Sequence, residues 1–123
     1  MARILVVDDV VDAVVLTEKI LRRKGYEVIG FTDEEEALAY AVCHPVDLAI
    51  LDIKLKKLSG IEVLRELKKI NPQIKVIMLT GYPTLDTARQ AVEYGASEYC
   101  VKPIEKDELE EKVHTVLHSE GKS

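Results

Sequence analysis

The sequence predicts an α/β protein in which a parallel sheet of five strands is covered by five helices on its two faces. Short apolar runs, typical of strands buried on both faces, alternate five times with patterns typical of amphipathic helices. Strict alternation of this kind favours parallel strands joined by helical crossovers. A second observation is that glycine, asparagine and proline stand where the helical patterns stop.

The first expected strand is Ile4-Leu5-Val6-Val7, which ends at two aspartates. The others are expected at Tyr26–Phe31, Asp47–Leu51, Val76–Leu79 and Tyr99–Val101. The helices are identified by apolar residues that recur at helical spacing. They are expected at Asp12–Lys24, Glu34–Cys43, Ile61–Ile70, Leu85–Tyr94 and Lys106–His118.

Local signals support these boundaries. Gly25, Gly95 and Asn71-Pro72 are typical of helix ends. Thr32-x-x-Glu35 and Ser59-x-x-Glu62 have the spacing of capping boxes, which predicts a helix start at each.

The composition is that of one globular domain, with 123 residues of which 47% are hydrophobic and 32% charged. The net charge is −5, which argues against binding of nucleic-acid phosphates by this domain. No apolar run approaches the roughly 20 residues of a membrane span, and the run after Met1-Ala2-Arg3 stops at Asp8, too early for a signal peptide. We therefore expect a cytoplasmic protein that contacts neither nucleic acid nor a membrane.

Polar side chains follow four of the five strands. Asp8 and Asp9 follow the first, Asp52 the third, Thr80 the fourth and Lys102 the fifth. In an open parallel sheet, ligands bind outside the carboxyl ends of the strands. The sequence therefore predicts that three carboxylates, a hydroxyl and an ammonium group lie at one edge.

Carboxylates that lie close together repel one another unless a cation neutralises them. Oxygen ligands without histidine or cysteine favour Mg²⁺, which suits phosphoryl chemistry. Aspartate is also a known covalent phosphoryl acceptor, and a lysine and a metal ion can balance the charge of the transferred group. These residues indicate a site that places a phosphoryl group on a carboxylate.

The motifs around these residues resemble the receiver domain of bacterial two-component response regulators. They are Val6-Val7-Asp8-Asp9, Leu51-Asp52-Ile53, Leu79-Thr80-Gly81, Gly95-Ala96 and Tyr99-x-x-Lys102-Pro103. The resemblance covers Arg3 to about Leu117 and implies a doubly wound, flavodoxin-like fold with strand order 2-1-3-4-5. We expect a receiver domain over residues 1–119 and a tail, or the start of a linker, over 120–123.

The resemblance also implies a role for each matching residue. Asp52 is expected to accept the phosphoryl group. Asp9 is expected to bind Mg²⁺ directly and Asp8 through a metal-bound water, with the main-chain carbonyl of Lys54 and the Asp52 carboxylate completing the metal site.

The other matching residues are expected to act on the phosphoryl group or respond to it. Lys102 would pair with the phosphoryl oxygens, and the Lys102-Pro103 peptide bond would be cis. Thr80 matches the switch hydroxyl, and Tyr99 matches the aromatic residue that turns inward on activation.

The implied function is a phosphorylation-dependent signalling switch that catalyses only its own phosphorylation and autodephosphorylation. Its expected partners are a sensor histidine kinase or phosphotransfer protein and a downstream effector. A phosphorylation-dependent homodimer is a further expectation. Lys112 and His114, however, stand where one transcription-factor subfamily carries arginines that pair across its dimer.

Two departures from the family pattern lie beside the acceptor. Lys56 replaces the usual proline, which makes Lys54-Leu55-Lys56-Lys57 a basic loop. The loop is interpreted as a solvated turn. The alternative is a basic patch beside the acidic site that faces a partner or steers a substrate. Tyr82, two residues after Thr80, would hinder an attacking water if its ring faced the site, or point outward instead.

Several groupings that resemble metal sites are interpreted as structural. Cys43 and Cys100 are expected to be small buried hydrophobic residues. His114 and His118 are one helical turn apart without a further ligand, and are expected to face solvent. The acidic run Asp33–Glu36 is interpreted as first-turn carboxylates that interact with a helix dipole.

Two other functions are compatible with the same fold. A module that binds FMN or a nucleotide would need a Ser/Thr/Gly-rich loop after the first strand, where Asp8-Asp9 would repel a phosphate. A Mg²⁺-dependent phosphohydrolase with Asp52 as nucleophile usually has an acid or base two residues later, and here that residue is Lys54.

Overall fold

The computed structural model describes residues 1–119 and contains the expected elements in the expected order. The strands are β1 (Arg3–Val7), β2 (Glu27–Phe31), β3 (Leu48–Leu51), β4 (Lys75–Thr80) and β5 (Glu98–Val101). The helices are α1 (Val11–Arg23), α2 (Glu34–Cys43), α3 (Gly60–Ile70), α4 (Leu85–Glu93) and α5 (Lys106–Leu117). Every boundary lies within one residue of its expected position. The expected tail, 120–123, lies outside the described residues.

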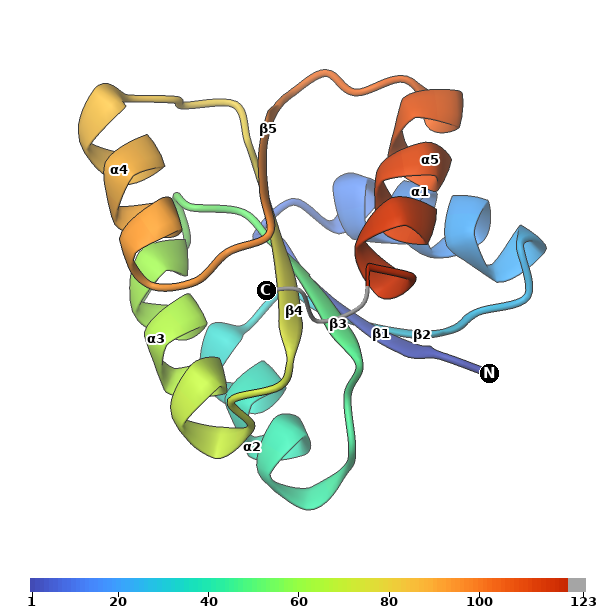
Figure 1. The fold of residues 1–123 in the computed structure, drawn as a ribbon, viewed down its shortest axis with the longest axis horizontal. Helices are drawn as coiled ribbons and strands as arrows, with labels where there is room; N and C mark the ends of the chain where they lie inside the picture. Colours follow the sequence, from blue (N-terminus) through green and yellow to red (C-terminus); the bar gives the residue numbers. More distant parts are fainter. Residues whose placement is uncertain (120–123) are drawn as a thin grey trace.

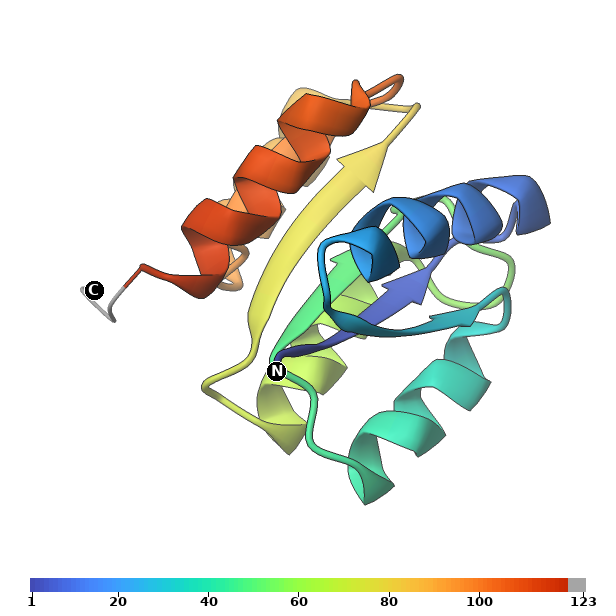
Figure 2. The same ribbon diagram turned by 90° about the vertical axis from the view of Figure 1, so that its right-hand side faces the viewer.

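The sheet has the order β2-β1-β3-β4-β5 with every neighbouring pair parallel, which confirms the expected topology. Figure 1 shows α2, α3 and α4 on one side of the sheet and α1 and α5 on the other. In Figure 2 the arrows of β1 and β4 point toward the same end of the molecule. The carboxyl ends of the strands therefore meet at a single edge.

Side chains of the central strands alternate between two buried clusters. Leu5 and Val7 of β1 belong to the cluster under α2, α3 and α4, whereas Ile4 and Val6 belong to the cluster under α1 and α5. Because β1, β3 and β4 are covered on both faces, nearly all their side chains are buried and their sequences are continuously apolar. The edge strand β5 keeps half-buried and exposed positions.

The predicted helix ends are confirmed except at α2. Ser59 and Glu62 form a reciprocal capping box at α3, and Gly25 follows α1 with a φ of 94° that favours glycine. The prediction that Thr32 caps α2 is wrong. The cap is Asp33, whose Oδ1 accepts hydrogen bonds from the main-chain N–H groups of residues 35 and 36 at 2.8 and 3.1 Å. Thr32 lies one residue too early for this role.

The prediction that both cysteines are buried holds for Cys100 and is wrong for Cys43. Cys43 is the last residue of α2, and the buried stripe of that helix is formed by Ala37 and Ala41 instead. Position 43 is turned away from this stripe and faces solvent. Among residues 1–119, no helix combines the length and the apolar character needed to cross a membrane.

Candidate functional site

The register of the sheet places Asp8 and Asp52 side by side. Val7 of β1 is paired with Leu51 of β3, and an aspartate follows each of them. The Asp52 N–H donates to the carbonyl oxygen of Val7 at 3.0 Å, so the pairing continues one residue beyond the strands. Both aspartates are buried. The sequence prediction that they lie together at this edge is confirmed.

Lys102 enters the same site from the end of β5. Its main-chain N–H donates to the Thr80 carbonyl oxygen at 2.8 Å, which holds the residue beside β4. Its Nζ donates to Asp8 Oδ2 at 2.6 Å and to Asp52 Oδ2 at 3.1 Å. The Lys102-Pro103 peptide bond that follows is cis.

These contacts affect the ionisation of Lys102. Burial alone lowers its pKa, but the hydrogen bonds to Asp8 and Asp52 outweigh burial and hold the pKa above its ordinary value. Lys102 is therefore a permanent positive charge between two carboxylates at neutral pH.

Each of the two buried carboxylates has one oxygen fixed by the main chain. Asp8 Oδ1 accepts from the Val10 N–H at 3.0 Å. Asp52 Oδ1 accepts from the Ile53 N–H at 2.6 Å and, at 3.4 Å, from the Lys54 N–H. The second oxygen of each aspartate contacts Lys102. The main chain and Lys102 together fix the orientation of both side chains.

Asp9 adds a third carboxylate. Asp8, Asp9 and Asp52 each offer an oxygen within 4.8 Å of the others. One ammonium group cannot neutralise three carboxylates, and the oxygen-only donor set fits a hard divalent cation. A cavity of about 540 Å³ opens over this cluster. Its lining includes Asp9, Val10, Asp52, Lys54, Leu55, Gly81, Tyr82 and Lys102.

Thr80 and Tyr99 lie on the same face of the sheet, because Tyr99 is paired with Met78 and side chains two residues apart share a face. Thr80 is fully buried, and its Oγ1 accepts from the Tyr82 N–H at 3.0 Å. The hydroxyl of the partly buried Tyr99 lies 2.7 Å from Thr87 Oγ1 on α4. Tyr99 thereby connects β5 to the first turns of α4.

Tyr82 stands at the rim of the cavity rather than inside it. The residue is 61% exposed, and Lys54 Nζ lies 4.4 Å from the centre of its ring. Of the two orientations considered for Tyr82, the structure shows the outward one.

Glu34 lies in the first turn of α2, as predicted, but the sequence analysis did not predict that this carboxylate is buried. It is 1% exposed and accepts hydrogen bonds from the main-chain N–H groups of Lys57 and Leu58 in the loop after Asp52. Helical spacing contains the signal that was missed. Glu34 lies three and seven residues before the buried Ala37 and Ala41, and therefore on the same helix face.

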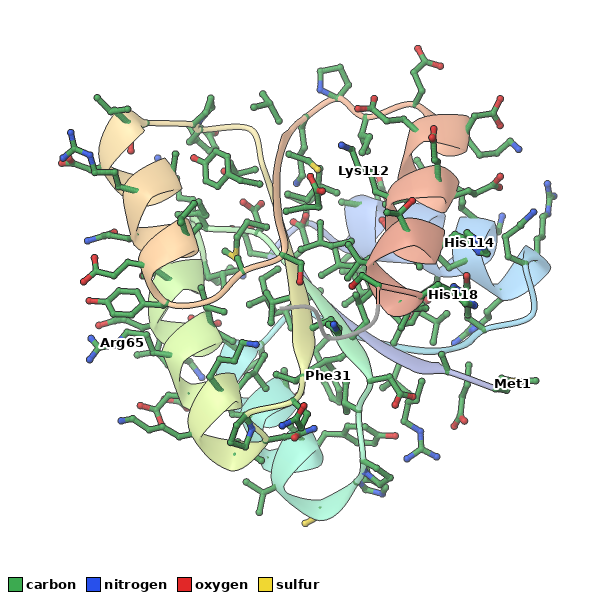
Figure 3. The ribbon with its side chains drawn as sticks, viewed as in Figure 1. Met1, Phe31, Arg65, Lys112, His114 and His118 are labelled. Carbon is green, nitrogen blue, oxygen red and sulfur yellow. The ribbon has the colours of Figure 1, made fainter. Side chains whose placement is uncertain are left out.

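The remaining candidates lie away from the site. His114 on α5 and His118, which follows the last residue of that helix, are both exposed, as expected (Figure 3). The centres of their rings are 4.2 Å apart. Lys112, on the same helix, forms an ion pair with Glu98 of β5 at 3.3 Å. Within the basic loop, Lys57 is paired with acidic residues of α2 and its cap, while Lys54 and Lys56 are exposed.

Comparison with known proteins identifies the class. The family model of the response regulator receiver domain matches residues 4–114. The chain belongs to this family, whose members are phosphorylation-dependent signalling switches. The comparisons give no support to a flavin or nucleotide binder or to a phosphohydrolase.

Curated relatives include proteins of very different length. The transcriptional regulatory protein ZraR of Klebsiella oxytoca is 37% identical over 107 residues, which cover 87% of this chain and 24% of ZraR. Sporulation initiation phosphotransferase F of Bacillus subtilis is 32% identical over 115 residues, which cover 94% of this chain and 93% of that protein. The chain therefore spans about a quarter of the first relative and nearly all of the second.

Solved structures agree with the fold. A CheY-like receiver domain protein from Methanospirillum hungatei has a TM-score of 0.93 and 37% identity, over 95% of this chain and 94% of the other. A response regulator from Burkholderia pseudomallei, solved with a phosphorylated aspartic acid and a calcium ion, has a TM-score of 0.86 and 29% identity. That match covers 97% of this chain and 68% of the other.

Proposed function

We propose that Asp52 accepts a phosphoryl group from a sensor histidine kinase or phosphotransfer protein, and that the modified domain then binds a downstream effector differently. The observation that supports this most strongly is the convergence of three carboxylates and one ammonium group at the carboxyl edge of the sheet. The cytoplasm is the proposed location, and any homodimer is expected to depend on phosphorylation.

Mg²⁺ is the proposed cofactor. Asp8, Asp9, Asp52 and the main-chain carbonyl of Lys54 would hold it, with Asp9 in direct contact and Asp8 acting through a bound water. When bound, Mg²⁺ would balance the negative charge of the phosphoryl oxygens. A likeness to a solved regulator that contains a phosphorylated aspartic acid and a calcium ion supports this donor set.

The residues of the chain itself supply positioning and charge. An Asp52 oxygen forms the new O–P bond while the P–N bond of the donor phosphohistidine breaks, and the donor imidazole leaves. Lys102 already contacts Asp52, so its ammonium group would remain in reach of the phosphoryl oxygens that arrive there. The main-chain N–H groups of Ile53 and Lys54 fix the other Asp52 oxygen during transfer.

Thr80 and Tyr99 are the proposed relay. A phosphoryl group adds about −1.5 to −2 charges at pH 7, which would attract the Thr80 hydroxyl away from its bond with the Tyr82 N–H. Tyr99 lies on the same face and contacts α4 through Thr87. Movement of Thr80 would therefore be transmitted to the surface formed by α4 and β5.

Phosphorylation by a small acyl phosphate tests the acceptor without a kinase. Intact mass is measured for the wild type and for Asp52→Asn, each with acyl phosphate and Mg²⁺ and again with EDTA. We expect the mass of one phosphoryl group to be added only to the wild type with Mg²⁺. An unchanged wild-type mass, or equal labelling of Asp52→Asn, would refute the assignment.

A further inference from the structure

The loop between Asp52 and α3 is anchored by a buried carboxylate of α2, that of Glu34. Glu34 Oε2 accepts hydrogen bonds from two successive main-chain N–H groups, those of Lys57 and Leu58, the second at 2.6 Å. Glu34 itself is 1% exposed. Burial alone raises the pKa of Glu34, but hydrogen bonds from Leu58, its own main chain and Lys57 outweigh burial and lower it. Glu34 is therefore ionised at neutral pH.

The two ends of this loop are fixed by different contacts. The Gly60 N–H donates to the Ile53 carbonyl oxygen at 2.7 Å, and the Leu55 N–H donates to the same oxygen at 3.1 Å. At Gly60 the backbone approaches so closely that an added Cβ would lie 2.0 Å from the Asp52 carbonyl oxygen. The stretch from Lys56 to Leu58 is held against α2 by Glu34.

The composition of the loop explains why such an anchor matters. No proline occurs between Asp52 and Gly60, so no residue there has a fixed φ and every residue has an N–H group to satisfy. A single carboxylate that accepts from two neighbouring N–H groups fixes the conformation of the chain there. The ion pairs of Lys57 Nζ with Asp33 and Glu35, at 2.8 and 3.3 Å, lie further out and are half exposed.

We propose that Glu34 is a positioning residue for the metal and phosphoryl site, acting through the main chain of the loop that carries Lys54. This inference rests on the proposed function, in which the Lys54 carbonyl is a metal ligand. Without Glu34, residues 56–58 would lose their attachment to α2. The Lys54 carbonyl would then be less firmly held in place as a ligand, and Mg²⁺ would bind more weakly.

The test compares Glu34→Ala and Glu34→Gln with Glu35→Gln. Glu35→Gln removes the same charge from the neighbouring, exposed position, which contacts only the Lys57 side chain in this loop. Mg²⁺ dissociation constants are measured by titration of ¹⁵N-labelled protein, and stability by urea unfolding in EDTA. The Mg²⁺ concentration that gives half the maximal rate of phosphorylation by an acyl phosphate is the third measurement.

Loss of a group that orients a metal ligand typically weakens metal binding by about 10–100-fold. We expect Glu34→Ala to weaken Mg²⁺ binding about tenfold and to raise the Mg²⁺ concentration for half-maximal phosphorylation by the same factor. Glu34→Gln keeps an acceptor oxygen and should fall between Glu34→Ala and the wild type. Glu35→Gln should stay close to the wild type, since exposed ion pairs contribute little.

A loss of stability alone would not support the proposal, because a purely structural residue leaves the Mg²⁺ requirement of the folded protein unchanged. Wild-type Mg²⁺ affinity in the Glu34 variants would overturn it, and if Glu34→Ala does not fold, Glu34→Gln decides. If the wild type itself shows no Mg²⁺-dependent shifts around Asp52, the proposed function fails and this inference fails with it.

Discussion

Replacement of Lys102 by methionine should destabilise the metal-free protein, because it removes the ammonium group that separates two buried carboxylates. Methionine keeps much of the apolar stem, so the change acts mainly on charge. Lys102 Nζ lies 2.6 Å from Asp8 Oδ2 and 3.1 Å from Asp52 Oδ2. At an effective dielectric constant of about 20, these distances correspond to gross attractions of about 6 and about 5 kcal/mol.

The net effect is smaller, because the desolvation of all three groups opposes the attraction. Loss of one partner from a buried ion pair typically costs about 3–5 kcal/mol, since the remaining charge is left uncompensated. The Lys102 side chain is 27% exposed, so solvent screens part of the interaction. We therefore expect Lys102→Met to lower the free energy of unfolding in EDTA by about 3 kcal/mol, the low end of that range.

Urea unfolding with EDTA and with saturating Mg²⁺ is the assay. A ligand at 100 times its dissociation constant stabilises the folded state by about 2.7 kcal/mol. Lys102→Met leaves three carboxylates without an ammonium group, so Mg²⁺ should bind it more tightly and stabilise it more than the wild type. The reasoning would be refuted if the two proteins were equally stable in EDTA, or if Mg²⁺ raised the free energy of unfolding of Lys102→Met by less than that of the wild type.

The same interaction defines a pH dependence. The pKa of Lys102 in the folded state is raised above its ordinary value of 10.5. Its stabilising contribution is therefore complete below that pH and is lost as the pH rises through the folded pKa. The stability difference between the wild type and Lys102→Met should be constant near neutral pH and shrink in strongly alkaline solution.

Two other predictions concern the loop after Asp52. Gly60→Ala should cost about 3 kcal/mol in urea unfolding, because its Cβ would meet the Asp52 carbonyl oxygen at 2.0 Å. Gly81→Ala is the control, because its Cβ would meet only the Lys102 side chain, at 4.0 Å, and it should change the free energy of unfolding by less than about 0.5 kcal/mol. Similar losses of stability in the two glycine variants would contradict this expectation. The lowered pKa of Glu34 gives the wild type a stabilising contribution that is present above the ordinary value of 4.5 and is lost as the pH falls through the folded pKa. In urea unfolding from pH 7 down to pH 3, the stability advantage of the wild type over Glu34→Gln should therefore shrink only below about pH 4.5, and a pH-independent difference would contradict it.

The order of elements and the edge that carries the site could be predicted from the sequence because both depend on strong local signals. Continuous apolar runs identify strands covered on both faces, and the residue that follows each strand is placed by the parallel topology itself. Asp8, Asp52 and Lys102 are far apart in the sequence, yet each follows such a run, so their meeting is a consequence of the fold.

Two of the features that were predicted wrongly or not predicted depend on tertiary contacts, and the third is a local contact. The exposure of Cys43 depends on how α2 is rotated against the sheet, which its short apolar pattern did not define. Asp33 caps α2 in place of Thr32 because its Oδ1 reaches two main-chain N–H groups once the helix begins at Glu34. The burial of Glu34 is explained by a loop more than twenty residues later, whose N–H groups no local pattern could have assigned to it.

The central claim is that a phosphoryl group on Asp52 changes the α4 and β5 surface through Thr80. Its most direct test is the ¹⁵N NMR spectrum of the wild type and of Thr80→Ala, recorded with Mg²⁺ before and after addition of beryllofluoride as a phosphoryl mimic. In the wild type we expect shifts near Asp52 and across residues 84–101. In Thr80→Ala we expect the shifts near Asp52 to remain and those across 84–101 to be lost. Wild-type shifts across 84–101 in the variant, or none there in the wild type, would contradict the claim.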